Sequence, residues 1–137
     1  MKTSFLTILI LILTLGSCNK DEITNSALFA AWEAKSFMSL ESVAYPKNED
    51  KAILLIFMKD GTYSLKLDVN SCGGTFTSGK GNQLLIGSTA CTEACCDSKF
   101  SEKLASMISR VTSYEVYRET LKLNVPQWGY IELVRSN

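Results

Sequence analysis

The spacing of apolar residues changes twice along the chain, and this pattern limits the possible folds more than any other feature. Short segments of alternating apolar and polar residues come first, a helical stripe follows, and alternation then returns. Alternation is typical of half-buried strands, and the stripe Phe100, Leu104, Met107, Ile108 and Val111 lies on one helix face. The pattern predicts an α+β domain: a curved antiparallel β-sheet of about seven to eight strands, with one helix inserted before the last three. The expected strands are residues 31–39, 52–58, 62–69, 75–77, 83–87, 113–117, 121–125 and 129–134.

Local signals support these elements. Asp60-Gly61 separates two strand patterns, and a hairpin is expected there because glycine adopts the positive φ of a tight turn at low cost. The unbroken apolar run at 52–58 is typical of a strand buried on both faces. Asp97 or Ser98 is expected to cap the helix N-terminus. The residues expected in the core include Trp32, Phe57 and Leu104.

The first residues predict a secretory signal rather than part of the domain. Lys2 precedes residues 5–15, which are almost all Leu, Ile or Phe. As a helix this run measures roughly 16 Å, well short of a hydrocarbon core of about 30 Å. A short apolar run after a positive charge suits a signal peptide. We therefore assign residues 1–17 to a lipoprotein signal peptide.

The tetrapeptide Leu15-Gly16-Ser17-Cys18 resembles the processing site of bacterial lipoproteins. Small residues beside the scissile bond admit the peptidase, and the Cys18 thiol accepts the lipid. Two or three acyl chains such as palmitate hold a protein stably on a membrane. We expect Cys18 to be lipidated, residues 18–29 to form a tether, and residues 30–137 to form the domain. The acidic stretch Asn19–Glu22 fits either an export signal to the outer face of the outer membrane or a solvated linker.

Composition excludes several classes of function. The chain has no histidine, which removes Ser-His-Asp and Cys-His catalysis and imidazole metal ligands. Its 14 basic and 14 acidic residues include Lys2 of the signal peptide, so the mature charge is near minus one and indicates no nucleic-acid partner. Carboxylate pairs such as Glu49-Asp50, or Glu93 with Asp97, suit solvated loops or caps better than acid–base catalysis. We expect no enzymatic activity and no cofactor.

Several motifs in order resemble the META/HslJ-like domain of small bacterial envelope proteins, over about Ala30 to Val134. They are Trp32, Leu55-Ile56-Phe57, Lys59-Asp60-Gly61, Asn70-Ser71-Cys72-Gly73-Gly74, Leu84-Leu85-Ile86-Gly87, Thr92-Glu93-Ala94-Cys95-Cys96 and Leu121-Lys122-Leu123. The resemblance implies a curved antiparallel sheet packed on a helix, no established catalytic site, and an association with envelope stress. It places Cys96 at the family cysteine position, whereas Cys91 and Cys95 are additional. A lipocalin-like barrel is the alternative, but its helix follows the last barrel strand.

Four cysteines remain besides Cys18, and export to an oxidising compartment favours disulfides. A bridge between the neighbours Cys95 and Cys96 would close a strained ring. The resemblance favours Cys72 with Cys96 and Cys91 with Cys95, and the exchanged pairing, Cys72–Cys95 with Cys91–Cys96, stays open. A thiolate site for copper or zinc is an alternative to disulfides, because Cys91 and Cys95 could share a helix face. Free or redox-active thiols are a third possibility.

These observations predict a membrane-anchored envelope lipoprotein whose non-catalytic domain binds a ligand or partner and is related to stress. A thiolate metal-binding or redox-active lipoprotein is the alternative. An assembly partner of an envelope complex is a further possibility. An exposed apolar groove would favour ligand binding, and a flat apolar patch would favour a protein partner.

Overall fold

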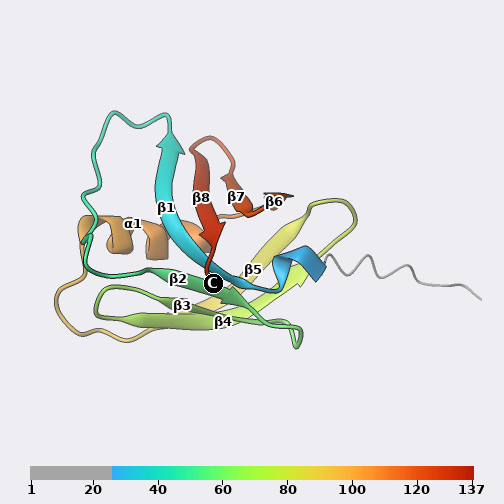
Figure 1. Cartoon of the computed structure of the whole chain (residues 1–137), viewed down its shortest axis with the longest axis horizontal. Coiled ribbons are helices and arrows are strands. Elements are labelled where there is room, and N and C mark those ends of the chain that lie inside the picture. Colours follow the sequence, from blue (N-terminus) through green and yellow to red (C-terminus); the bar gives the residue numbers. More distant parts are fainter. Residues whose placement is uncertain (1–25) are drawn as a thin grey trace, which may run out of the picture.

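A computed structural model describes residues 26–137 as one curled antiparallel sheet with a single α-helix before the last three strands, as the sequence predicts (Figure 1). The eight strands neighbour one another in the order β5-β4-β3-β2-β1-β8-β7-β6. The elements are η1 (Ser26–Leu28), β1 (Ala31–Ser39), β2 (Leu54–Phe57), β3 (Thr62–Lys66), β4 (Ser71–Ser78), β5 (Leu84–Cys91), α1 (Lys99–Ile108), β6 (Ser113–Tyr117), β7 (Thr120–Val125) and β8 (Gly129–Arg135). No helix among residues 26–137 is long and apolar enough to cross a membrane.

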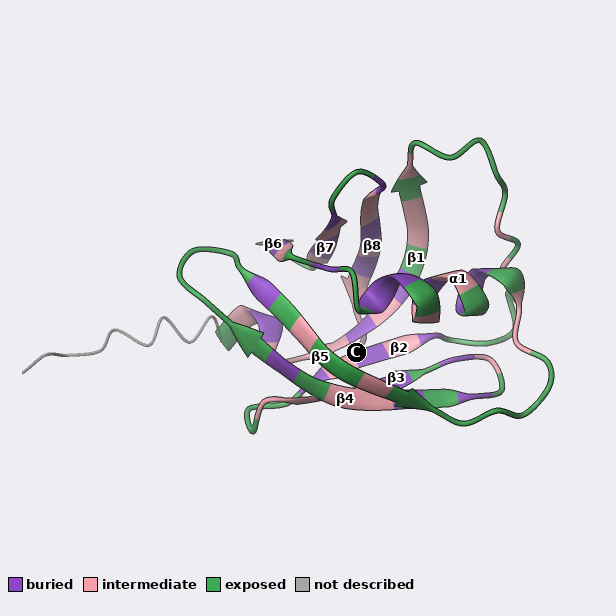
Figure 2. Cartoon of the chain, turned by 180° about the vertical axis from the view of Figure 1, so that it is seen from behind, coloured by how far each residue is buried: buried purple, intermediate pink, exposed green. Residues whose placement is uncertain are grey.

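The sheet curls until its two edge strands meet at one end. Leu84 N donates to Thr112 O at 3.0 Å, and Tyr114 N donates to Asn82 O at 2.9 Å, so the start of β5 touches the start of β6. Beyond this point β5 and β6 separate, and the sheet forms a half-barrel. Helix α1 lies between the two halves of the sheet, on its concave side (Figures 1 and 2).

Helix α1 begins and faces the core as its sequence predicts. Ser98 is the N-cap, and its side chain accepts a hydrogen bond from Ser101 N at 3.2 Å. This bond satisfies one of the amide groups that the first helical turn leaves unpaired. The buried face of α1 carries Phe100, Ser101, Leu104, Met107 and Ile108.

The expected core residues Trp32, Phe57 and Leu104 are all buried, with 0%, 2% and 0% of their surface exposed. Trp32 also donates from Nε1 to Leu28 O at 2.9 Å, which satisfies the indole N–H inside the core. Leu28 is itself 1% exposed. The packed domain therefore begins before the expected boundary at residue 30, because η1 already contributes to the core.

Strand β2 differs from its prediction of burial on both faces. Leu55 and Phe57 are buried, whereas Leu54 and Ile56 remain partly exposed. The reason lies in the architecture, because α1 covers the concave side of the sheet and no second layer formed by residues 26–137 covers the convex side (Figure 2). A continuous apolar run cannot reveal this difference by itself.

Gly61 adopts a φ of +82° in the turn between β2 and β3, as its sequence context predicts.

Strands β4 and β5 are longer than expected, and a glycine in β4 permits their close pairing. In β4, a Cβ at Gly74 would collide with Ser88 O of β5 and lie 3.1 Å from the Tyr63 ring. Glycine therefore permits β5 to continue alongside β4 as far as Cys91.

Candidate functional site

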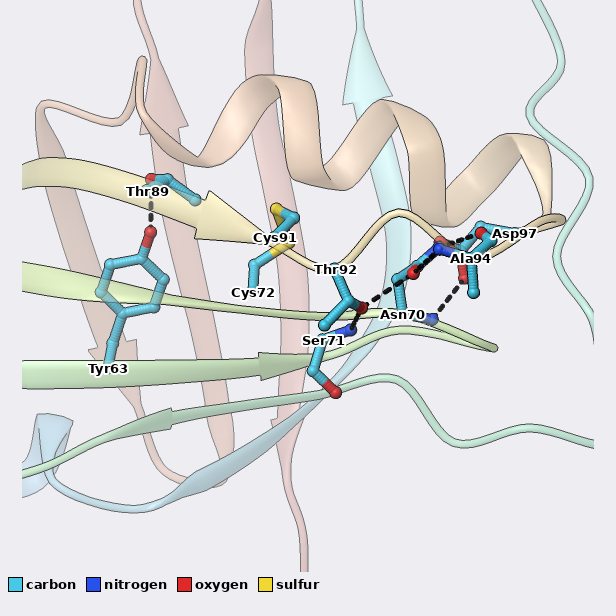
Figure 3. The surroundings of a disulfide bond; sticks show 9 residues. All are labelled: Tyr63, Asn70, Ser71, Cys72, Thr89, Cys91, Thr92, Ala94 and Asp97. Atoms are coloured by element: carbon cyan, nitrogen blue, oxygen red, sulfur yellow. Dashed lines mark hydrogen bonds between the residues drawn. A yellow bond between two sulfur atoms is a disulfide. The ribbon is translucent and has the colours of Figure 1, made fainter.

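The cysteines predicted as site residues form a different pattern from the expected one. Cys18 lies outside the described residues. Cys72 and Cys91 are direct cross-strand partners of β4 and β5 and are joined to each other (Figure 3). The expected pairings of Cys72 with Cys96, and of Cys91 with Cys95, are therefore wrong in this structure. The difference arises because β5 extends to Cys91, four residues past the end of the expected strand at residue 87.

Cys95 and Cys96 are bonded to each other and lie exposed in the segment before α1. The pairing of Cys72 with Cys91 leaves these neighbours as the remaining pair, although the sequence alone argues against a bridge between adjacent residues. Among residues 26–137, no group of three or more Cys, Asp or Glu side chains could hold a metal ion. The thiolate metal site expected as the alternative thus has no ligand cluster in the described chain.

A polar network fastens the cysteine segment to the turn between β3 and β4 (Figure 3). The side chain of the buried Asn70 accepts from Thr92 Oγ1 at 2.8 Å and from Ala94 N at 2.7 Å, and donates to Asp97 Oδ2 at 2.6 Å. Asp97 also accepts from Val69 N at 2.8 Å. These partners give Asn70 and Asp97 a structural role, because they hold the cysteine segment in place.

Asp68 serves the helix N-terminus in the same way. Its Oδ2 accepts from Ser98 N at 2.8 Å and from Ser101 Oγ at 2.7 Å, and it also bonds Ser98 Oγ. Burial alone would raise the pKa of Asp68, but the hydrogen bonds from Ser98 and Ser101 outweigh it and the pKa is lowered. A carboxylate at the positive end of a helix is stabilising, so Asp68 supports the fold.

A groove of about 740 Å³ lies between strand β1 and the long connection that follows it, residues 40–53. This volume is within the range of ligand sites in proteins, roughly 300–1,000 Å³. Most residues of the 40–53 connection are exposed, and Figure 2 shows the connection arching away from the tip of β1. The lining includes Glu33, Phe37, Met38, Glu41, Val43, Tyr45, Lys47, Glu49 and Phe100.

The floor of the groove is aromatic. The Phe37 ring stacks on Phe100 of α1, with ring centroids 4.2 Å apart and planes 9° apart. Tyr45 and Trp128 meet the same Phe37 ring edge-on, at centroid distances of 5.8 and 5.5 Å. These contacts join β1, the connection, α1 and the β7–β8 turn, so the floor is preformed.

A β-bulge in β1 aims Phe37 into this floor. Trp32 and Ala34 face the core, and simple alternation would next turn Ser36 inward. The register against β8 shifts between Ala34 and Ser36, which inserts Lys35 as an extra residue. The shift turns Phe37 inward instead, as bulges commonly re-aim side chains next to sites.

Two lysines hold the connection against the body of the domain. Lys103 of α1 bonds Glu41 at 2.9 Å and lies 4.9 Å from the Tyr45 ring centroid and 5.3 Å from that of Trp128. The hydrogen bond from Tyr45, with the help of Lys103, lowers the pKa of Glu41 to about 2. Lys47 donates to Ala34 O at 2.9 Å and lies 3.7 Å from Glu33.

Two apolar residues of the groove lining are uncovered. Met38 and Val43 have 55% and 59% of their surface exposed, and Leu40, which lies between them in the chain, is 85% exposed. The remaining predicted carboxylates have separate positions: Glu49 lines the groove, while Glu93 is exposed in the cysteine segment.

Sequence reasoning missed the groove. The available signal was the length of the 40–53 connection, because structureless connections of this length in compact domains are uncommon and often functional. Its apolar residues Leu40, Val43 and Tyr45 are a second signal. Apolar residues in a loop without a strand or helix pattern are not committed to a regular element, so they can form a binding surface.

The half-barrel with one inserted helix places the chain among small domains built on a single curled antiparallel sheet. The META domain family matches residues 26–136, and the chain belongs to this family. No curated protein matches the chain.

Two solved structures share the fold. One is a DUF4847 family protein from Bacteroides vulgatus, with a TM-score of 0.61, 16% identity, and coverage of 83% of this chain and 97% of that one. The other is a protein from Burkholderia xenovorans solved by NMR, with a TM-score of 0.64, 14% identity, and coverage of 80% and 83%. At these identities the likeness concerns the fold alone.

Proposed function

We propose that this protein is a lipid-anchored envelope lipoprotein whose META domain binds a partner, without catalysis, through the groove between β1 and residues 40–53. One observation carries the proposal: Met38 and Val43 of the groove lining stay exposed beside a preformed aromatic floor, and Leu40 is exposed between them in the chain. Exposed apolar residues that gather at a concave site mark an interaction surface more often than scattered ones do.

The chemistry of the groove supports binding rather than turnover. Glu41 and Glu33 are engaged with Lys103, Lys35 and Lys47, and the chain has no histidine to move a proton near neutral pH. Glu41, with its pKa of about 2, stays ionised and is a poor general acid or base. The groove therefore offers shape, apolar surface and fixed charges.

The anchor rests on the sequence alone. Leu15-Gly16-Ser17-Cys18 resembles a lipoprotein processing site, and few residues separate Cys18 from Ser26, where the described fold begins. So short a tether would hold the domain close to the outer membrane, and an outward position is part of the proposal. The stress-related role follows from the family resemblance.

A photo-crosslinking experiment tests the groove. A photoreactive amino acid replaces Val43 in the full chain, expressed in its own envelope, and the matched control carries it at Tyr117, which is 70% exposed on β6. We expect a discrete adduct from position 43 and none from position 117, and mass spectrometry identifies the adduct. Equal labelling at both positions, or none at position 43, would count against the groove as a binding site.

A further inference from the structure

Strand β1 has one unpaired edge, and that edge lies inside the groove. β8 pairs with β1 from Trp32 to Ser39, whereas β2 pairs only with Ala31, Trp32 and Glu33. Figure 1 shows β1 extending past β2, with β8 on one side and the 40–53 connection arching away on the other. The outer half of β1 therefore has a neighbouring strand on one side only.

The register shows which backbone groups face the open side. Leu40 N donates to Trp128 O at 2.9 Å, on the β8 side of the strand. Because the groups of successive residues alternate between the two sides of an antiparallel strand, Met38 also faces β8. The N–H and C=O groups of Phe37 and Ser39 consequently face the groove.

Along this open edge of β1, only the first backbone acceptor, Ala34 O, has a donor within residues 26–137. Lys47 Nζ donates to Ala34 O at 2.9 Å, in the place where a neighbouring strand would offer an amide. Within residues 26–137, no backbone hydrogen bond joins Lys35–Ser39 to the connection. Folded proteins usually pair, cover or blunt such an edge, because it can accept a strand from another chain.

We propose that the groove takes an extended polypeptide segment of a partner protein, which adds to β1 as a strand at Phe37 and Ser39. This inference rests on the proposed function and names the chemical class of the partner. Five residues beside Lys35–Ser39 would span about 17 Å. Alternate side chains of the added strand would lie on the aromatic floor of Phe37 and Tyr45, and the others would point away from the floor, towards the side of Met38.

The observations favour a polypeptide over other occupants. An acyl chain would cover the exposed apolar residues but would leave the two amides and two carbonyls of Phe37 and Ser39 without partners. The lysines at the groove, Lys35, Lys47 and Lys103, are each within 4 Å of a carboxylate, so they leave no free cationic cluster for an anionic headgroup. A main chain supplies both donors and acceptors at the strand spacing.

Peptide selection followed by N-methyl scanning tests the proposal. The protein purified from membranes is the bait for a displayed library of short random peptides, and the Tyr45→Ala variant, with its fold checked by circular dichroism, is the counter-selection. Enriched peptides are then synthesised with one backbone nitrogen methylated at a time. We expect methylation at alternate positions to weaken binding about tenfold or more, because each removes one main-chain hydrogen bond, with little effect at the positions between.

The outcomes separate this inference from the proposed function. Binding that tolerates methylation at every position would overturn strand addition. A library without enriched peptides, together with an adduct to lipid or glycan from position 43, would also overturn it while leaving the groove as a binding site. Failure of both the library and the crosslink would overturn both proposals.

Discussion

Removal of the Cys72–Cys91 bond should destabilise the domain by an amount that follows from the loop it closes. The two cysteines are 19 residues apart, and chain-entropy arithmetic assigns a loop of about 20 residues roughly 3 kcal/mol. A domain of roughly 110 residues loses about 4 °C of melting temperature per kcal/mol. We therefore expect the Cys72→Ser, Cys91→Ser double variant to melt about 10–15 °C lower.

The matched control is the Cys95→Ser, Cys96→Ser variant. No residues lie between Cys95 and Cys96, so their bond closes almost no loop in the unfolded chain. Its removal should therefore shift the melting temperature far less. Thermal unfolding followed by circular dichroism, on protein purified after export and without reductant, measures both shifts.

Peptide mapping under non-reducing conditions tests the pairing directly. Cleavage after Lys and Glu places Cys72 on residues 67–80, Cys91 on residues 81–93, and Cys95 with Cys96 on residues 94–99. The structure predicts that the first two fragments stay joined and the third is separate. A third fragment joined to the first would refute the pairing, and so would equal destabilisation of the two double variants.

Three further predictions concern the core, the groove and the anchor. Leu104→Ala should reduce the free energy of unfolding by about 2–5 kcal/mol in denaturant titrations, because Leu104 is fully buried in α1, and a loss below 1 kcal/mol would contradict this. By NMR, Glu41 should titrate near pH 2 in the wild type and nearer its usual 4.5 in Tyr45→Phe. The contact of Glu41 should stabilise the fold fully above pH 4.5, and this stabilisation should fade as the pH falls towards 2. An unchanged pKa of Glu41 in the variant would show that Tyr45 is not the cause. Cys18→Ala should move the protein from the detergent phase to the aqueous phase in Triton X-114 partition, whereas unchanged partition without acyl chains on wild-type Cys18 would exclude the anchor.

Much of the fold could be predicted from local patterns because they report local causes. Asp60-Gly61 marked its hairpin through the backbone freedom of Gly61, which adopts a φ of +82°. The stripe centred on Leu104 predicts α1 to within one residue at its start and three at its end, since a helix that packs against a sheet needs one apolar face.

Long-range register explains what the sequence could not show. The pairing of Cys72 with Cys91 depends on how β5 aligns with β4 past the irregularity between Gly74 and Phe76. Periodicity carries no such information, and the family resemblance favours Cys96 as the partner instead. The partial exposure of Leu54 and Ile56 likewise depends on which side of the sheet the single helix occupies.

The groove could be suspected from the sequence but not constructed from it. Its floor requires the bulge at Lys35, which turns Phe37 onto Phe100 across more than 60 residues of chain. Its open edge exists because β2 ends its pairing at Glu33 while β8 continues to Ser39. Both are differences between strand registers, and neither has a sequence signature.

Amide hydrogen exchange at Phe37 and Ser39 tests most directly whether the open edge of β1 is the binding surface. In the free protein, Met38 should exchange slowly because it is bonded to β8, whereas Phe37 and Ser39 should exchange faster for want of an acceptor. An enriched peptide at saturation should slow exchange at Phe37 and Ser39 by about tenfold or more. It should leave Ile86 unchanged, because Ile86 lies two residues after Leu84 and so faces the same side of β5, which is open beyond Leu84. Slow exchange at both amides in the free protein, or no change on binding, would show that the edge of β1 is not the surface that receives the partner.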